Sequence, residues 1–238
     1  MEKEAGILNN PRKNYCLRVW GPFAAFNRPE LKVERVSYDV ITPSAARAIF
    51  SAIFWKPAIR WHVTRIEVLN PIKFASIRRN EVAALASPKA GAVYIEEARQ
   101  QKSGVCLADV AYRLHADLEY LPPEERPKYN PGTEGPETPV KYFSMFERRA
   151  AKGQNFFTPY FGCREFSASF EYIPEEELAS NRSIYPALGP EHDRDFGVML
   201  FDMDFEANPA SPEAMFYRPK MASGVIEVPD ARSPEVLK

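Results

Sequence analysis

The segment of residues 15–69 constrains the fold most strongly, because it predicts two strands joined by one helix. Apolar and aromatic residues alternate with other residues along 15–20, which is typical of a half-buried strand. A second alternating stretch covers residues 59–69, and its phase changes near Thr64 and Arg65. Such a change of phase predicts a β-bulge. The segment is therefore expected to form one βαβ unit.

The helix of this unit is predicted to begin at Pro43, with Thr42 or Ser44 as the capping hydroxyl. Alanine and isoleucine residues then recur at helical spacing. The helix is expected to end before Lys56 and Pro57, because a residue that precedes proline is disfavoured in the α region.

Residues 110–120 show the clearest strand pattern in the chain. Apolar residues occupy every second position from Val110 to Tyr120. The positions between them hold Ala111, Arg113, His115, Asp117 and Glu119. One face of this strand is expected to pack on a core, and the other to meet water or a ligand.

A second amphipathic helix is predicted over residues 140–151, with Gly153 in the C-cap position. Its buried stripe is expected to contain Val140, Phe143, Phe146 or Glu147, and Ala150. Lys141, Met145, Arg148 and Lys152 follow one another at spacings of three or four, so three cations are expected to share its exposed face.

The remaining segments predict strands and loops rather than helices. Further strands are expected at residues 94–95, 166–172, 195–205 and 215–228. Loops are expected at residues 83–91, 99–104 and 121–139, and residues 76–82 are polar around an arginine pair. Few helices and many strands predict an α+β fold, with helices against a mainly antiparallel sheet and a β-rich region after about residue 170.

Charge is unevenly distributed along the chain. Residues 1–82 hold 14 Lys and Arg against 7 Asp and Glu, whereas residues 171–238 hold 6 against 14. A basic front and an acidic back suggest that one face binds a polyanion, and the alternative is a chance partition over a neutral surface.

Composition predicts a cytoplasmic protein without a metal site. No apolar run approaches the roughly 18 residues that a membrane-spanning helix needs, so no membrane association is expected. Three scattered cysteines without a CxxC pair fit a reducing compartment, and the three histidines do not cluster. No metal ligand set and no cofactor motif are therefore predicted.

Aromatic and basic residues side by side suggest nucleic-acid binding. Trp55-Lys56 and Arg78-Arg79 offer rings that stack bases next to cations that hold phosphates. The alternative is that Trp55 fills the core while Lys56 caps a helix. The cations of the second helix have a similar alternative, because a charged helix face is usually only solvated.

Seven strings of residues resemble the CRISPR-associated endoribonuclease of the type I-C (Dvulg) subtype, in the RAMP superfamily. They are residues 17–24, 28–30, 33–40, 43–47, 55–59, 77–81 and 162–166. The resemblance covers roughly residues 15–173 and is weaker in the acidic tail. It implies an N-terminal ferredoxin-like (RRM-like) domain, here residues 1–170, and a smaller C-terminal β-rich region, residues 171–238.

The resemblance also implies an activity and partners. Such proteins bind the repeat hairpin of precursor CRISPR RNA (crRNA), cut it at the base of the stem, and stay as a subunit of the type I-C surveillance (Cascade) complex. The cut needs no metal: the 2′-hydroxyl attacks the adjacent phosphate and leaves a 2′,3′-cyclic phosphate. Chemistry of this kind needs a base, a cation and an acid.

The catalytic residues of the resemblance match this chain in part. A tyrosine is expected just before the Trp-Lys-Pro string, where this chain has Phe54, and a Lys-His pair is expected where it has Lys141-Tyr142. Lys141 is therefore the predicted phosphate stabiliser and Tyr142 the candidate for proton transfer. The predicted RNA-binding residues are Trp55, Lys56, Arg78, Arg79, Arg148 and Lys152.

Two alternative functions remain. The first is a non-catalytic scaffold that binds the guide RNA or duplex DNA, which the Phe54 and Tyr142 departures favour. The second is an enzyme for a small anionic substrate with His115 as general base, because imidazole titrates near neutrality. A histidine satisfied within the sheet is the simpler interpretation of His115.

Overall fold

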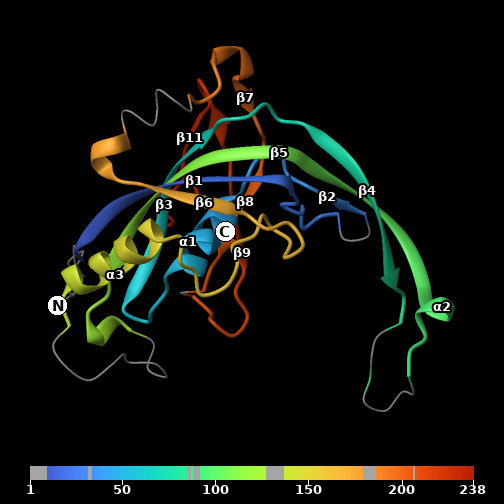
Figure 1. Ribbon diagram of the computed structural model, residues 1–238, viewed down its shortest axis with the longest axis horizontal. Helices are drawn as coiled ribbons and strands as arrows, with labels where there is room; N and C mark the ends of the chain where they lie inside the picture. Colours follow the sequence, from blue (N-terminus) through green and yellow to red (C-terminus); the bar gives the residue numbers. More distant parts are fainter. Residues whose placement is uncertain are drawn as a thin grey trace.

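The computed structural model describes residues 10–31, 34–84, 87, 92–126, 137–178, 186–205 and 207–238 (Figure 1). Its main sheet contains β1 (Arg12–Ala24), β2 (Arg35–Val36), β3 (Ile59–Val68), β4 (Phe74–Val82), β5 (Arg99–Tyr120), β6 (Ser169–Ile173) and β11 (Val225–Glu227). The helices are α1 (Pro43–Ile53), α2 (Ile95–Ala98) and α3 (Pro139–Ala151). Short 3-10 turns are η1 (Pro123–Glu125), η2 (Glu175–Glu177) and η3 (Pro190–His192).

The central strands of the main sheet lie in the order β11-β3-β5-β1-β6, and neighbours are antiparallel. Helix α1 connects β1 to β3, and α3 connects β5 to β6, so each helix joins two parallel strands that have one antiparallel strand between them. The fold is therefore α+β, as predicted, and this order is consistent with the ferredoxin-like arrangement.

The core lies between the sheet and the two longer helices, and aromatic rings fill its centre. Phe146 of α3 lies 4.6 Å from Tyr15 and 4.8 Å from Trp61 between ring centroids, and Phe50 of α1 lies 4.8 Å from Trp61. The indole of Trp61 donates a hydrogen bond to the carbonyl of Phe54 at 2.9 Å, which satisfies its N–H. These contacts hold α1 and α3 against one face of the sheet.

The predicted βαβ unit is present: α1 begins at Pro43 and β3 at Ile59 as predicted, while β1 is longer at both ends than the predicted strand of residues 15–20. The Thr42 hydroxyl caps α1 by accepting from the backbone N–H of Ala45 at 3.3 Å. The pairing of β3 with β5 shifts register between Val63 and Arg65, so the predicted bulge is present. Gly153 follows α3 with φ of +64°, as expected of a helix C-cap.

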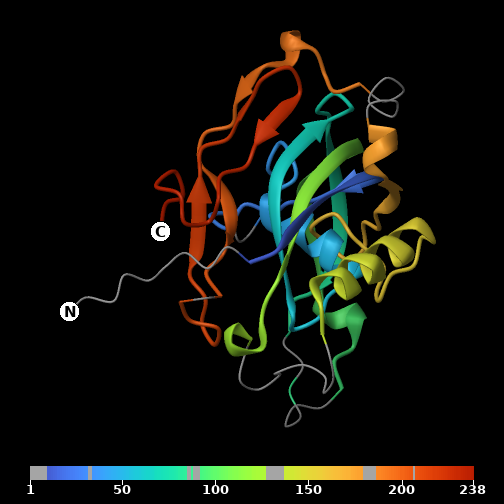
Figure 2. The ribbon, with the colours of Figure 1, turned by 90° about the vertical axis from the view of Figure 1, so that its left-hand side faces the viewer.

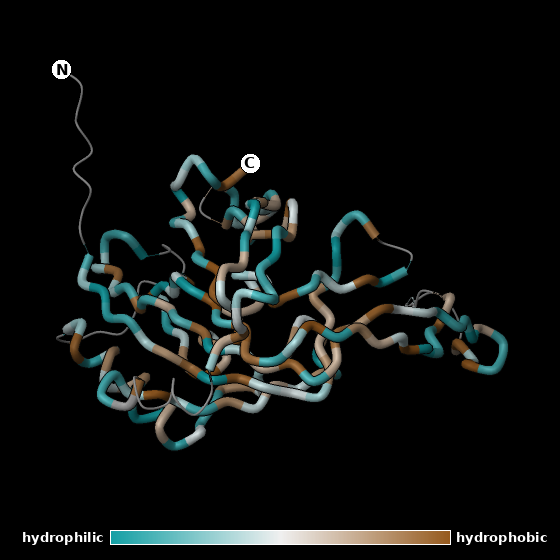
Figure 3. Tube along the Cα trace, turned by 90° about the horizontal axis from the view of Figure 1, so that it is seen from above, coloured by the Kyte–Doolittle hydropathy of each residue, from teal (hydrophilic) through white to brown (hydrophobic). Residues whose placement is uncertain are grey.

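A long two-stranded arm was not predicted. Residues 99–104, expected as a loop, are the start of β5, and they pair with β4, which contains the polar residues 76–82. The predicted short strand at residues 94–95 is also wrong, because Ile95 begins helix α2. The arm extends away from the body of the molecule and carries hydrophilic and hydrophobic residues along its length (Figures 1 and 3).

Two predicted faces differ from the structure. The polar face of β5 was expected to meet water or a ligand, but Arg113, His115 and Glu119 are buried because they form ion pairs within the sheet. On α3, Phe146 and Ala150 are buried as predicted, but Val140 is 67% exposed and Tyr142 is buried, so the first turn of the stripe differs from the prediction.

Loops and chain segments outside the described residues leave some predictions untested. Residues 127–136 of the predicted loop 121–139 lie outside them, as do most of residues 85–91. Within the described part, no helix is long and apolar enough to cross a membrane.

The C-terminal region is rich in strands, of which β11 joins the main sheet while four others form two separate two-stranded sheets (Figure 2). Strands β7 (Arg194–Asp195) and β10 (Lys220–Met221) pair, as do β8 (Met199–Met203) and β9 (Ala214–Tyr217), while β11 pairs with β3. The predicted boundary at residue 170 falls inside β6, which pairs with β1. The division into residues 1–170 and 171–238 stays a prediction.

Candidate nucleic-acid interface

The first turn of α3 places Lys141 and Tyr142 in different environments. Lys141 is exposed, and its ammonium lies 5.9 Å from the centre of the Tyr142 ring. Tyr142 is 4% exposed, and its hydroxyl donates to Glu137. Glu137 in turn binds the Arg126 guanidinium at 2.5 Å. Arg126 also donates to the Tyr120 hydroxyl at 3.3 Å, so Tyr142 belongs to a buried polar network.

This network disfavours proton transfer by Tyr142. Burial, and then the hydrogen bond to Glu137, raise the pKa of Tyr142 above its ordinary value. A phenol with a raised pKa is a weak acid, and its phenolate is almost absent at neutral pH. In the predicted role, Tyr142 could therefore exchange a proton with RNA only after its hydrogen bond to Glu137 has broken.

Phe54 is buried at the C-terminal end of α1 and has no ionisable group. The Arg149 guanidinium of α3 lies 5.9 Å from its ring centre. The aromatic position before the Trp-Lys-Pro string is thus part of the core in this chain.

The predicted RNA-binding residues are mostly exposed. Trp55 is 54% exposed, which removes the alternative that it fills the core. Lys56, Arg148 and Lys152 are also exposed. These side chains are free of the core and are available to a ligand.

The neighbouring arginines Arg78 and Arg79 of β4 lie in different environments. Arg79 binds Glu165 at 2.6 Å and lies over the Phe166 ring at 5.5 Å, so it holds the 162–166 turn against the arm. Arg78 has the opposite orientation on the strand and is exposed. Only Arg78 of the pair therefore presents its cation outward.

A cavity of about 930 Å³ lies beside the edge of β3. Residues 59–63 of β3 pair with β5 on one side, whereas β11 pairs only with residues 65–67 on the other. The open edge therefore faces the cavity, which is also lined by α1, β8 and the segment that follows β11. Its charged lining residues are Arg12, Arg47, Arg60, His62, Glu125, Arg126, Asp202, Asp204, Asp230, Arg232 and Lys238, and Trp55 also lines it.

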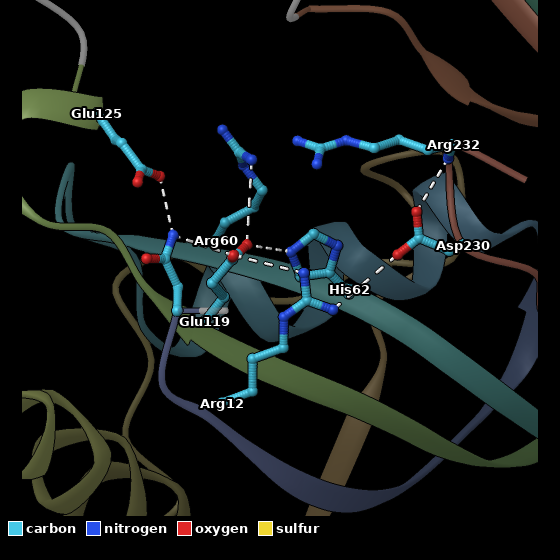
Figure 4. A network of polar contacts seen from close by, with 8 residues as sticks. Arg12, Arg60, His62, Glu119, Glu125, Asp230 and Arg232 are labelled. Atoms are coloured by element: carbon cyan, nitrogen blue, oxygen red, sulfur yellow. Dashed lines mark hydrogen bonds and ion pairs between the residues drawn. The ribbon is translucent and has the colours of Figure 1, made fainter. Parts of the chain in front are cut away.

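The polar network that borders this cavity centres on His62 and Glu119 (Figure 4). The Nε2 atom of His62 lies 2.6 Å from Oε2 of Glu119. Arg12 of β1 lies 3.4 Å from the same carboxylate, and Arg60 of β3 lies 4.0 Å from it. Three strands of the sheet therefore converge on one buried carboxylate.

The environment of Glu119 keeps it ionised. Burial alone would raise the pKa of this carboxyl group, but the hydrogen bond and charge of His62, with the charges of Arg12 and Arg60, outweigh burial and lower the pKa to about 2. A permanent carboxylate can hold the imidazole of His62 in one orientation and one tautomer.

His115 has a different environment, because its carboxylate partner lies on a neighbouring strand inside the sheet. It is 2% exposed, and its Nε2 lies 2.9 Å from Glu67, which also pairs with Arg113. Burial lowers the pKa of His115, despite the opposing effect of the Glu67 hydrogen bond. His115 does not line the cavity, so the expected pocket for a small anion is not found around it among the described residues.

Sequence reasoning missed the pair of His62 and Glu119. The alternation along β3 and β5 places both on the polar face of the sheet, but only the register brings them together, with Arg60 opposite Glu119. Within the described ranges, no group of three or more His, Cys, Asp or Glu side chains is arranged to hold a metal ion.

The sheet and its two helices define an α+β protein with a cavity at one sheet edge that is lined by side chains of both charges. The family model described as CRISPR-associated protein (Cas_Cas5) matches residues 15–229. The chain therefore belongs to this family of CRISPR-associated proteins.

Named relatives agree with this assignment. The chain is 43% identical to the CRISPR pre-crRNA endoribonuclease Cas5d of Mannheimia succiniciproducens, over 93% of this chain and 97% of that protein. It is 42% identical to the protein of the same name from Thermus thermophilus, over 85% of this chain and 79% of that one. A solved structure titled "Crystal Structure of CRISPR-associated Protein" has a TM-score of 0.68 at 22% identity, covering 97% of this chain and all of that one, and it shows the shared fold.

Proposed function

We propose that this chain is an endoribonuclease that binds the repeat hairpin of precursor crRNA and cleaves it. The observation that carries the proposal is the 43% identity, across nearly the whole of both chains, to a protein named as a pre-crRNA endoribonuclease. The exposed cations of α3 and of the β4 arm support it, because they suit a phosphate backbone.

We further propose a cut that needs no metal. The 2′-hydroxyl beside the scissile phosphate attacks phosphorus, and the products are a 2′,3′-cyclic phosphate and a 5′-hydroxyl. Lys141 would stabilise the negative charge that develops on the phosphoryl oxygens. Its exposed ammonium at the N-terminal turn of α3, where the helix dipole also attracts anions, supports this role.

The backbone of the RNA would be held by Lys56, Arg78, Arg148 and Lys152, with Trp55 stacking on a base. Arg79 would contribute through Glu165, by fixing the turn that adjoins the arm. After cleavage the protein would stay in the cytoplasm as a subunit of the type I-C surveillance complex, where duplex DNA is a further candidate ligand.

The test is cleavage of end-labelled repeat RNA by the purified protein in EDTA, with a 2′-deoxy substitution at the cut site as the control substrate. A single cut that the 2′-deoxy nucleotide abolishes is the expected result. Lys141→Ala should lower the single-turnover rate about 100-fold or more, because one group that stabilises transition-state charge is typically worth 10²–10³. Lys220→Ala, at an exposed lysine on β10, is the matched control and should leave the rate unchanged.

The second candidate function is a scaffold that binds RNA without cutting it. Phe54 and the engaged hydroxyl of Tyr142 favour it, because neither offers a ready proton carrier. Tight binding with a steep salt dependence and no cut in this assay would establish the scaffold and exclude the nuclease.

A further inference from the structure

The proposed reaction needs a group that accepts the proton of the 2′-hydroxyl, and the first turn of α3 does not supply one. The ammonium of Lys141 has no lone pair, and the hydroxyl of Tyr142 is a donor to Glu137. The following inference rests on the proposed function and concerns the source of this base.

The three histidines of the chain differ in their access to a ligand. His115 is buried among Glu67 and the arginines of the sheet. His192 is in the short turn η3, beside Glu191, and does not line the cavity. His62 lines the cavity, and its side chain is 21% exposed. It is the histidine that combines an accessible ring with a buried carboxylate partner.

The geometry of His62 suits a general base. Because Glu119 accepts from Nε2, the tautomer with its proton on Nε2 is favoured, and the lone pair then lies on Nδ1. Within the described part of the chain, Nδ1 of His62 has no hydrogen-bond partner. A histidine whose second nitrogen is fixed by a carboxylate is the arrangement that general-base catalysis uses.

We propose that the cavity beside β3 holds the nucleotide at the scissile phosphate, and that His62 accepts the proton of its 2′-hydroxyl while Glu119 positions the imidazole. Glu119 is a positioning residue, because it acts through His62. The rest of the lining fits a nucleotide: Arg12 and Arg60 lie beside the His62–Glu119 pair, and the exposed indole of Trp55 offers a surface for a base.

The cavity is connected to the first turn of α3. Arg126 lines the cavity and binds Glu137, which accepts from Tyr142. One continuous run of contacts therefore leads from the cavity to the residue that follows Lys141.

The step balances in atoms and charge. As the 2′-oxygen forms its bond to phosphorus, the 2′-hydroxyl proton passes to Nδ1 of His62. The bond from phosphorus to the 5′-oxygen breaks, and that oxygen takes a proton from a water molecule in the cavity. The imidazolium then returns its proton to the resulting hydroxide. No oxidant, reductant or further reactant is required.

The test compares His62→Gln with His192→Gln in single-turnover cleavage of repeat RNA. His62→Gln should slow the cut about 100-fold or more, within the range of general-base contributions, while binding of the 2′-deoxy RNA is retained. Imidazole added to His62→Ala should restore part of the rate, which a merely structural role would not allow. His192→Gln should cut like the unsubstituted protein.

The outcomes separate this inference from the proposed function. Cleavage by the unsubstituted protein and by His62→Gln at equal rates would overturn the role of His62 and leave the nuclease intact. Absence of cleavage by the unsubstituted protein would overturn both.

A second measurement observes the unsubstituted protein itself, and the variants serve only to assign its spectrum. Binding of the 2′-deoxy RNA to the unsubstituted protein should shift the ring C–H resonances of His62 in a ¹H–¹³C spectrum and leave those of His192 in place. With three histidines in the chain, the spectrum can be assigned from the two glutamine variants. Unshifted His62 resonances at saturating RNA would show that no nucleotide reaches the cavity.

Discussion

At the scale of single residues, Glu119 shows how a buried charge becomes stable. Its carboxylate is 5% exposed, a position that would be costly without partners. One histidine and two arginines, each from a neighbouring strand position, offset that cost. The same contacts that keep the group ionised also fix the imidazole of His62, so stability and the proposed catalytic geometry depend on one side chain.

The lowered pKa of Glu119 predicts a pH-dependent contribution to stability. The folded-state pKa of about 2 is below the ordinary value of 4.5, so the contribution is complete above pH 4.5 and disappears as the pH falls toward 2. Its upper limit is about 3 kcal/mol, at 1.36 kcal/mol per pKa unit. Urea unfolding of the unsubstituted protein and of Glu119→Gln should therefore give free energies that differ most at pH 5 and converge toward pH 2. A difference that does not change with pH would show that Glu119 is not held ionised in the native state.

At the scale of elements, sequence reasoning succeeded where one local pattern decides the structure. Thr42 before Pro43 and Gly153 after α3 act through their own backbone neighbours, so their positions predict where the helices begin and end. The apolar alternation that ends at Tyr120 likewise marks a strand with one face on the core.

Sequence reasoning failed where the structure of an element depends on a partner that is distant in the sequence. Residues 99–104 have no apolar period, because the arm has little core to cover, and they are extended because β4 pairs with them. For the same reason the site was predicted only in part. Exposure of Lys141 follows from local pattern, whereas that pattern left open whether Trp55 fills the core. The meeting of His62 with Glu119, 57 residues away, requires the register of β3 on β5.

Gly162, in the segment between α3 and β6, gives a prediction at this scale. Gly162 has φ of +76°, and an added Cβ would lie 2.0 Å from the Ala25 carbonyl oxygen. Gly162→Ala should therefore cost about 2–5 kcal/mol, the sum of left-handed backbone strain and overpacking. Gly153→Ala is the matched control: its φ is +64°, nothing lies within 4 Å of the added carbon, and only about 1–2 kcal/mol of strain is expected.

Thermal or urea unfolding of the two variants measures this difference. Equal losses at the two glycines would mean that the turn moves away from Ala25 without cost. The turn at Gly162 lies within the string 162–166 that resembles the endoribonuclease family, and its close approach to Ala25 gives a physical reason for a glycine there.

At the scale of the whole molecule, the uneven charge along the sequence is partly neutralised inside the fold. Asp202 of β8 binds Arg47 of α1 through both carboxylate oxygens, at 2.5 and 2.9 Å. Arg12 of β1 lies 4.0 Å from Asp230, across the same two regions. The acidic tail thus meets the basic front in specific pairs, and β11 continues the main sheet. These contacts argue that the C-terminal region unfolds together with the rest of the chain.

Asp202→Asn tests that cooperativity, because all three tryptophans lie in the first 61 residues and none lies in the C-terminal region. Loss of a hydrogen-bonded ion pair should cost about 1.5–3 kcal/mol. If the two regions form one cooperative unit, the substitution lowers the midpoint seen by tryptophan fluorescence and the midpoint seen by far-ultraviolet circular dichroism by the same amount. A tryptophan transition that stays in place while the circular dichroism transition moves or splits would mean that the strands after β6 unfold as a separate domain, and the division near residue 170 would then be a real boundary.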